Sequence, residues 1–394
     1  MISETVSRLS PSATFEMARR SAELSAQGID VANLSVGEPD FPTPDHIKAA
    51  AVQAIEHNCT KYSPVPGYPQ LREAIAGKLR RENGLEYSTS EILVSGGAKQ
   101  SVCNAVLALV NPGDEVIIPA PYWVSYPQMV KLAGGTPVHV FAGIESNFKI
   151  TPEQLEKVIT PRTRLLILCS PCNPTGAVYS RGELESLAAV LLRHPDVYVI
   201  SDEIYEHINY TGGVFSIAAV PGMRERTVVV NGVSKAYAMT GWRIGFAAAP
   251  RKIISACNML QGQYTSGPCS VSQMAAVAAW NGPQECVEQM RRSFLERRNL
   301  LVGLLRGIPG LEVNCPDGTF YLFPKCSAFL GRQYQGREIA TATDLAMFLL
   351  ETGHVATVGG DAFGAPGYLR LSYAASEVTI TMAAQRIKAA LEKL

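Results

Sequence analysis

The sequence predicts an α/β protein with a doubly wound, mostly parallel sheet in a large domain, followed by a smaller α+β domain. Short apolar runs alternate with amphipathic runs as far as Trp280, which is typical of a parallel sheet covered by helices on both faces. Beyond Trp280 a long charged helix is expected, and two more strand-like runs follow it. With 394 residues, of which 47% are hydrophobic and 18% charged, the chain is long enough for two domains.

Seven runs in the predicted large domain are expected to be strands, because they are short, β-branched and apolar throughout. In chain order they are residues 91–96, 115–120, 137–141, 164–170, 197–202, 227–232 and 244–249. Helical patterns lie between most of them, and the clearest examples are 70–83 and 183–194. In the smaller domain we expect a helix at 284–307 and strands at 319–325 and 368–374.

The charge balance and the absence of targeting patterns exclude several function classes. Lys+Arg and Asp+Glu are equal in number, so nothing in the net charge favours binding to nucleic acid or to an anionic membrane. No apolar run approaches the roughly 20 residues of a membrane helix, and the N-terminus lacks a signal-peptide core. We therefore expect a cytoplasmic protein whose nine cysteines are thiols.

In doubly wound sheets, ligands bind outside the carboxyl ends of the strands, so the residues directly after each strand are the candidates. Gly97, Ala98 and Lys99 follow the first strand and open a helix, as in a phosphate-binding turn. The Walker spacing is absent, and a plain tight turn is the alternative for this segment alone. Trp123 follows the second strand, where it either stacks on a planar ligand or packs against the core.

Three charged residues follow later strands. Asp202 ends a buried run, so its carboxylate needs either a structural salt bridge or a cationic ligand group such as a pyridinium nitrogen. Lys235 lies in a small-residue stretch after a strand, where a lowered pKa would favour Schiff-base chemistry. Arg243 follows in the same glycine-rich stretch and offers a planar fork for a phosphate.

Two signals overlap in 169-CSPCNPTG-176. Cys169 and Cys172 have the C-x-x-C spacing of a redox dithiol or of half a zinc site, whereas Asn173 begins a turn. The chain has six histidines, no H-E-x-x-H and no second C-x-x-C, so we expect no metal site. We expect neither thiol to be catalytic: Cys169 should pack at the strand end, and Cys172 should border the site.

Four motifs together resemble the class I aminotransferases, which are pyridoxal-phosphate enzymes with transferase fold type I. The motifs are 36-VGEPDF-41, 169-CSPCNPTG-176, 201-SDEIYE-206 and 232-GVSKAYAMTGWRIG-245. Residues 10–20 and 368–374 also match, so the resemblance covers nearly the whole chain in the expected order. It is strongest to the bacterial aspartate aminotransferase branch, which also contains prephenate aminotransferases.

The resemblance implies roles around the ring of the cofactor, pyridoxal 5′-phosphate. Lys235 would form the internal aldimine and then move a proton between the substrate α-carbon and the cofactor. Asp202 would pair with the pyridine nitrogen, which keeps the ring an electron sink. Tyr205 and Asn173 would bond the phenolic oxygen, and Trp123 would stack on the ring and border the substrate. Lys235, Asp202 and Tyr205 are thus the expected catalytic residues.

The resemblance also implies a phosphate site. Gly97, Ala98 and Lys99 would contribute mainly their backbone N–H groups, and Arg243 would bind the phosphate directly. Many relatives have a serine three residues before the lysine, where this chain has a glycine. Ser234 is expected to replace that hydroxyl in part.

For the substrate, the resemblance implies that Arg370 holds the α-carboxylate, assisted by Asn173 and the backbone of Gly37. Tyr62 would reach the phosphate of the neighbouring subunit, which implies a homodimer with shared active sites. Bacterial relatives carry a basic residue that contacts the distal carboxylate at the position of Ser10. Another cation must therefore take that role here, or the specificity is broader.

The expected function is transfer of the amino group of L-aspartate, or a similar amino acid, to 2-oxoglutarate in a ping-pong cycle of amino acid metabolism. Prephenate, alanine and aromatic aminotransferases or a lyase of the same cofactor class are alternatives. A ligand-sensing regulator is a further alternative, but we expect no DNA-binding module. The resemblance divides the chain into an N-terminal segment at 1–46, a large cofactor-binding domain at 47–280 and a small domain at 281–394.

Overall fold

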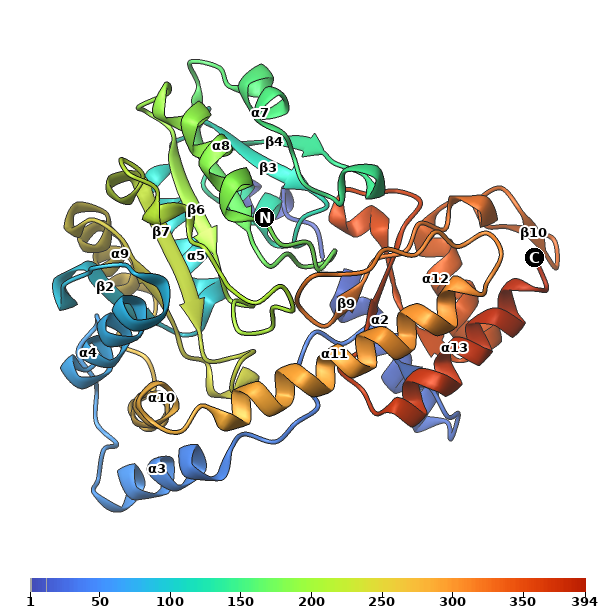
Figure 1. Ribbon diagram of the computed structural model, residues 1–394, viewed down its shortest axis with the longest axis horizontal. Helices are drawn as coiled ribbons and strands as arrows, with labels where there is room; N and C mark the ends of the chain where they lie inside the picture. The colour runs from blue at the N-terminus through green and yellow to red at the C-terminus, as the bar shows by residue number, and fades with distance from the viewer. Residues whose placement is uncertain (1, 12) are drawn as a thin grey trace.

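The computed structural model describes residues 2–11 and 13–394, which form an α/β architecture around one large mixed sheet (Figure 1). The predicted strands of the large domain make up this seven-stranded sheet, in the order β2-β8-β7-β6-β5-β3-β4. β8 is antiparallel to both neighbours and the other pairs are parallel, which confirms the mostly parallel prediction. The strands are β2 Ile92–Ser95, β3 Glu115–Ala120, β4 Thr136–Phe141, β5 Thr163–Cys169, β6 Tyr198–Asp202, β7 Thr227–Gly232 and β8 Gly245–Ala248.

Helices cover both faces of the large sheet (Figure 1). Val116 and Leu165 belong to a hydrophobic cluster with α5, α6 and α9. Their chain neighbours Ile117 and Leu166 belong to a cluster with α7 and α8. Successive strand residues point to opposite faces, so a strand buried on both sides is apolar throughout. These helices are α5 Ala98–Leu109, α6 Tyr126–Leu132, α7 Pro152–Val158, α8 Arg181–Leu192 and α9 Arg251–Tyr264.

Two predicted helices have different bounds in the structure. The helix expected at 183–194 begins at Arg181, because Ser180 and Glu183 form a reciprocal capping box at its start. The helix expected at 70–83 is α4 (Pro69–Lys78) followed by a π-helical turn at Leu79–Asn83. Gly84 follows that turn in a left-handed conformation, which glycine adopts readily.

The C-terminal part of the chain packs around a second core, which also includes residues near the N-terminus. Met17 and Leu34 belong to the same hydrophobic cluster as residues of α11, α12 and α13. β1 pairs in parallel with β12, and β13, β14 and β9 form an antiparallel sheet. The elements are α2 Ala13–Ala26, β1 Ala32–Asn33, α11 Glu285–Arg306, β9 Tyr321–Leu322, α12 Ala342–Gly353, β12 Val355–Ala356, β13 Val358–Gly359, β14 Leu369–Ser372 and α13 Glu377–Leu391.

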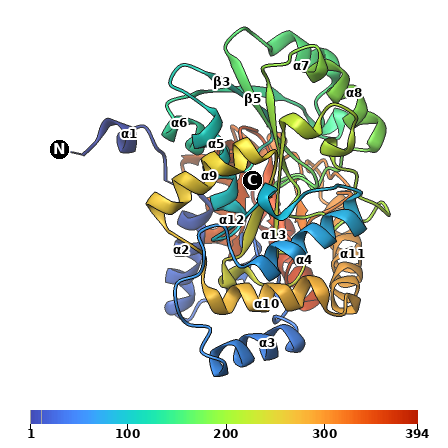
Figure 2. The ribbon, with the colours of Figure 1, turned by 90° about the vertical axis from the view of Figure 1, so that its left-hand side faces the viewer.

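Helices α3 (Asp45–Glu56), α4 and α10 (Ser270–Asn281) belong to a further hydrophobic cluster, which includes residues of β2, β7 and β8 in the large sheet. Figure 2 shows α3 lying beside α10, and α1 (Glu4–Ser7) near the start of the chain. A short hairpin is formed by β10 (Gln333–Tyr334) and β11 (Arg337–Glu338). Among the described residues, no helix has the length and apolarity that a membrane span requires.

Candidate active site

A cavity of about 570 Å³ lies at the carboxyl ends of the large sheet's strands, where the sequence predicts the site. All predicted site residues except Gly97 and Tyr62 line this cavity. They are Gly37, Ala98, Lys99, Trp123, Asn173, Asp202, Tyr205, Ser234, Lys235, Arg243 and Arg370. The fold thus brings together residues that are up to several hundred positions apart in the sequence.

Lys235 lies in the irregular segment that follows β7, and its ammonium group donates a hydrogen bond to the carbonyl oxygen of Gly37. Burial lowers the pKa of Lys235 to about 8; Arg370 and Arg243 act in the same direction, whereas Glu38 opposes them. An amine with this pKa has a substantial neutral fraction near pH 8, and the neutral form attacks a carbonyl carbon. Sequence reasoning did not single out Glu38.

Asp202 is the last residue of β6, and its side chain is buried. The hydroxyl of Tyr126 donates a hydrogen bond to Asp202 Oδ2 at 2.6 Å, and the Ile204 backbone N–H donates to Oδ1 at 3.3 Å. Burial raises the pKa of Asp202, although the bond from Tyr126 opposes this effect. A cation facing the carboxylate would favour its charged form. Tyr126 is a site residue to which the sequence analysis gave no role.

Tyr205 follows in the turn after β6, and its hydroxyl is 3.0 Å from the hydroxyl of Tyr321. Tyr321 comes from β9, in the C-terminal part of the chain, and also lines the cavity. Its hydroxyl lies so close to Gly37 that a Cβ there would be only 2.6 Å away, so any other residue at this position would displace the Tyr321 hydroxyl. Sequence reasoning missed Tyr321, because only the paired strands of the folded protein place it at the site.

Arg370 lies on β14, and its side chain is almost fully buried, with 2% of the residue exposed. Nη1 donates to Asn173 Oδ1 at 3.1 Å and Nη2 donates to the Ser35 carbonyl oxygen at 2.7 Å. Nε is buried without a partner, and no carboxylate of the described residues forms an ion pair with this guanidinium. A buried cation in this state is suited to an incoming carboxylate.

The residues that the sequence predicts for a phosphate site come together where α5 begins. Gly97 precedes the helix with φ of 95°, and a Cβ at this position would collide with the Arg243 guanidinium. Arg243 donates to the Gly96 and Thr240 carbonyl oxygens at 3.2 and 2.8 Å. Lys99 lies 5.2 Å from the centre of the Trp123 ring. Gly97 therefore does not line the cavity but allows the arginine to approach the helix N-terminus.

Two further expectations concern residues at the edges of the site. Ser234 is buried and lines the cavity, whereas Ser10 is exposed and its N–H donates to Gln128. Tyr62 is 98% exposed and lines a different cleft of about 660 Å³, between residues 59–63 and 267–271. Its contact with a neighbouring subunit stays a prediction. Within the matching stretch 10–20, residue 12 lies outside the described residues.

The cysteines of the C-x-x-C segment are both free. Cys169 is buried at the end of β5 and its thiol donates to the Pro171 carbonyl oxygen at 3.4 Å. The Cys172 thiol donates to the Pro121 carbonyl oxygen at 3.7 Å. It is Cys169, not Cys172, that borders the cavity, so the expectation for Cys172 is wrong. The strand end places the first thiol toward the site, and the second points to the loop after β3.

Comparisons with known proteins identify the family of the chain. Residues 29–387 match the aminotransferase class I and II family. An aspartate/prephenate aminotransferase of Cereibacter sphaeroides is 50% identical over 98% of both chains. A solved aspartate aminotransferase from Rhizobium meliloti is 46% identical over 100% of this chain and 99% of that chain, with a TM-score of 0.96.

A second solved structure, an aspartate aminotransferase from Thermus thermophilus with maleate, is 43% identical over 99% of both chains, with a TM-score of 0.93. These likenesses extend over nearly the whole length of each protein, so they include both the large sheet and the C-terminal part. The chain therefore belongs to the class I and II aminotransferases.

Proposed function

We propose that this aminotransferase uses pyridoxal 5′-phosphate to transfer the amino group of L-aspartate, or a similar acidic amino acid, to 2-oxoglutarate. One observation supports the proposal: a lysine with a lowered pKa shares one cavity with a buried carboxylate and with a buried arginine that pairs with no carboxylate in the described part of the chain. The names of the similar proteins, and the maleate in one of the similar structures, support an acidic substrate.

The residues of the cavity fit this cofactor. Arg243 and the backbone at the start of α5 would hold the phosphate, and Asp202 would face the ring nitrogen. The Asp202 pKa is raised by burial, which is the state of a carboxylate that lacks its cationic partner. Trp123 and Tyr205 line the same cavity and would bound the ring. When bound, the cofactor supplies an electron sink for the electron pair that remains after the α-proton leaves.

The protein's own groups bind the substrate and move the proton. Arg370 binds the α-carboxylate as a bidentate pair, and Asn173, bonded to the same guanidinium, holds its orientation. Binding of the α-carboxylate orients the α-hydrogen toward the amine of Lys235. The amine accepts this proton and then donates it to the carbon that is protonated next. Tyr126 holds Asp202 in place through its 2.6 Å hydrogen bond.

Lys99 is the cation that supports an acidic side chain in the substrate. Of the cationic residues that line the cavity, Lys235 is the amine of the reaction, Arg370 binds the α-carboxylate and Arg243 binds the phosphate. The Lys99 ammonium remains, close to the Trp123 ring and without an ion pair among the described residues. It therefore takes the place of the basic residue that Ser10 replaces.

Prephenate is the second candidate substrate. The Cereibacter sphaeroides relative is an aspartate/prephenate aminotransferase, and prephenate also carries a carboxylate away from its oxo acid group. The same ammonium of Lys99 would bind it. A stopped-flow panel of aspartate, glutamate, alanine, phenylalanine and arogenate as donors separates these possibilities, because each productive donor bleaches the visible band of the bound cofactor.

The reaction itself is tested with Lys235→Ala. The purified wild-type protein should absorb in the near-ultraviolet and visible range and transaminate, and the variant should lose both the band and the activity. Lys131→Ala, a change on the outside of α6, serves as the control and should behave as the wild type does. An active Lys235→Ala protein without the band would refute the proposal.

We also propose the homodimer and the domain division. The homodimer would have shared sites, with Tyr62 reaching the neighbouring phosphate; the nearly complete exposure of this side chain supports it. For the division at 46 and 280, the support is a core cluster that joins residues near the N-terminus to the C-terminal helices. Analytical ultracentrifugation of the wild type, and loss of cofactor affinity in Tyr62→Ala without dissociation, test the dimer.

A further inference from the structure

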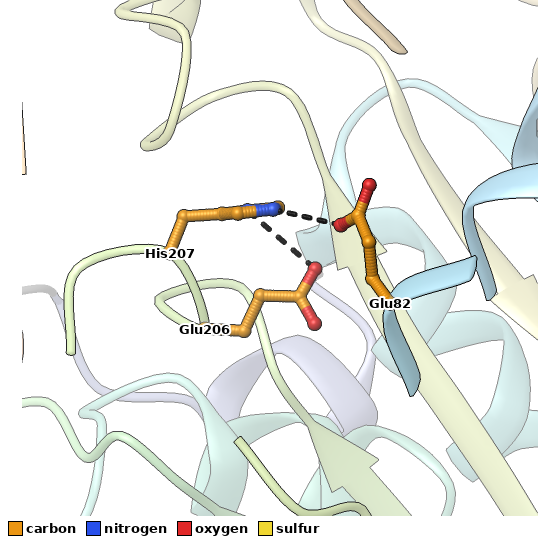
Figure 3. A group of neighbouring side chains, drawn as sticks. All are labelled: Glu82, Glu206 and His207. Atoms are coloured by element: carbon orange, nitrogen blue, oxygen red, sulfur yellow. Dashed lines mark hydrogen bonds and ion pairs between the residues drawn. The ribbon is translucent and has the colours of Figure 1, made fainter. Parts of the chain in front are cut away.

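An ionic cluster built on the buried pair Lys78 and Glu206 lies behind the turn that follows β6 (Figure 3). It consists of Lys78, Glu82, Asn83, Glu206 and His207. Figure 3 shows His207 joined by dashed lines to both Glu82 and Glu206. Its Nε2 is 2.9 Å from a Glu82 oxygen and its Nδ1 is 3.5 Å from a Glu206 oxygen. Lys78 is hydrogen-bonded to Glu206 and donates to Asn83 Oδ1 at 2.7 Å. Asn83 in turn donates to the second Glu206 oxygen at 2.9 Å.

The cluster does not favour a metal ion. The ligand atoms of Glu82, Glu206 and His207 lie within 4.8 Å of one another, which is a spacing that a cation could use. However, the ammonium of Lys78 is bonded to Glu206 and is 3.7 Å from Glu82, so it already supplies the positive charge. A divalent ion would have to displace a side chain that is only 1% exposed. The cluster is an internal ion pair with hydrogen-bonded neighbours.

The cluster is attached to the same turn as two of the proposed cofactor contacts. Asp202 and Tyr205 line the cavity, whereas Glu206 points to the cluster on the other side. Backbone bonds close the turn, from the Glu206 N–H to the Glu203 carbonyl at 2.9 Å and from the Ile208 N–H to the Tyr205 carbonyl at 2.8 Å. Glu206 thus follows Tyr205 directly in the chain and contacts the cluster on the side of the turn that faces away from the cavity.

Glu203 anchors the same turn more weakly. Its Oε1 accepts hydrogen bonds from the Ser201 and Ser216 hydroxyls at 2.7 and 2.5 Å, but Oε2 is buried without a partner. Burial raises the pKa of Glu203 to about 7. Burial acts in the same direction on Glu206, yet Lys78 and His207 outweigh it and hold that pKa at about 2. Of the two glutamates, Glu206 is therefore the permanent charge.

The backbone of the neighbouring element is shaped around this charge. Lys78 is the last residue of α4, and Glu82 and Asn83 belong to the π-helical turn at 79–83. Such turns are rare and are often found at functional sites. A buried ion pair contributes little net stability compared with apolar residues of the same shape, so stability alone does not account for it. The ion pair can instead act by holding the turn after β6 in a single conformation.

We propose that Lys78 and Glu206 are a positioning pair for the transamination reaction: they fix the turn after β6 and so set where the Tyr205 hydroxyl and the Asp202 carboxylate meet the cofactor. This inference rests on the proposed function. Neither Lys78 nor Glu206 lines the cavity, so both act through the residues that do.

The test uses the holoenzyme with Glu206→Gln and with the double variant Lys78→Met/Glu206→Leu. The measured quantities are the apparent pKa of the visible cofactor band, the dissociation constant of pyridoxal phosphate from equilibrium dialysis, and the Tm of the cofactor-free protein. A hydroxyl that donates to the phenolic oxygen favours the deprotonated form of the Lys235-bound chromophore. A displaced Tyr205 should therefore raise the band's apparent pKa by about one unit, and weaken cofactor binding roughly tenfold.

Glu115→Gln is the matched control. Glu115 is also a buried carboxylate with a bonded arginine, Arg162, but it lies at the start of β3, at the end of the strand away from the cavity. Its replacement should lower Tm and leave the band's apparent pKa unchanged. The double variant, which leaves no unpaired buried charge, should regain thermal stability and still show the shifted pKa.

The outcomes separate the two proposals. If the wild-type protein binds pyridoxal phosphate without a visible band, the proposed function is wrong and the positioning pair falls with it. If the wild type has the band, and the double variant titrates as the wild type does, the pair is structural only and the inference is refuted. Should Glu206→Gln fail to fold, the double variant decides the question by itself.

Discussion

Replacing Arg370 with lysine tests how the site recognises an α-amino acid. Arginine has five N–H donors, and two of them are used by Asn173 and the Ser35 carbonyl oxygen, so three remain for a carboxylate. Lysine has three donors in total, and satisfying the same two partners leaves one. Arg370→Lys thus keeps the charge but removes one or two charge-assisted hydrogen bonds, each contributing about 1.5–3 kcal/mol. We expect kcat/KM for aspartate to fall by roughly 10- to 150-fold if one bond is lost, and by up to about 25,000-fold if two are lost.

The assay is the half-reaction followed through the absorbance of the bound cofactor, with aspartate and with β-alanine as donors. β-Alanine has a carboxylate and an amine but no carboxylate on the carbon that bears the amine. The loss in Arg370→Lys should therefore be confined to aspartate. Arg224→Lys, which alters an arginine bonded to Glu91, should change neither rate. Equal losses for the two donors would show that Arg370 supports the fold of the site and does not bind the α-carboxylate.

Four further outcomes are expected. Lys99→Met should lower kcat/KM for aspartate about 10- to 100-fold and leave alanine nearly unaffected, as a donor panel would show. Because the pKa of Lys235 is about 8, the rate at which the cofactor-free protein captures pyridoxal phosphate should rise with pH and level off above about pH 8; an ordinary lysine would give a rise that continues toward pH 10. Asn173→Ala should lower turnover and shift the pKa of the visible band, whereas Cys172→Ser should retain most of the activity. Glu206 has its pKa lowered from 4.5 to about 2, so its contribution to the free energy of unfolding is complete above pH 4.5 and is lost as pH falls toward 2; Glu206→Gln should flatten that acid limb in urea titrations.

The strands of the large sheet could be predicted from the sequence because a strand that is buried on both faces is a short, mostly apolar run. β5 and β7 are almost wholly buried, and apart from Arg164 and Asn231 they consist of apolar or small residues. The site residues that follow strands were predicted for a related reason: parallel strands bring their carboxyl ends to one edge, so Asp202 and Lys235 had to be near each other.

Other features depend on contacts that no local pattern contains. Tyr126 and Tyr321 reach the site through packing between distant segments, and an isolated tyrosine in a sequence carries no mark of its hydrogen-bond partner. The bordering thiol was assigned to Cys172 because it adjoins Asn173 in sequence. Which thiol borders the cavity depends instead on the direction of the side chain at the end of β5, and this direction brings Cys169 to the cavity.

The pairing of β9 with β14 links two tasks of the enzyme mechanically. Ser372 of β14 is opposite Tyr321 of β9, and Arg370 lies two residues away on the same strand. Any rigid shift of this small sheet moves the arginine and the tyrosine together, and Tyr321 carries the shift to Tyr205 through their hydrogen bond. If Arg370 binds the substrate as proposed, we expect this pair of strands to transmit a change in its position to the Tyr205 hydroxyl.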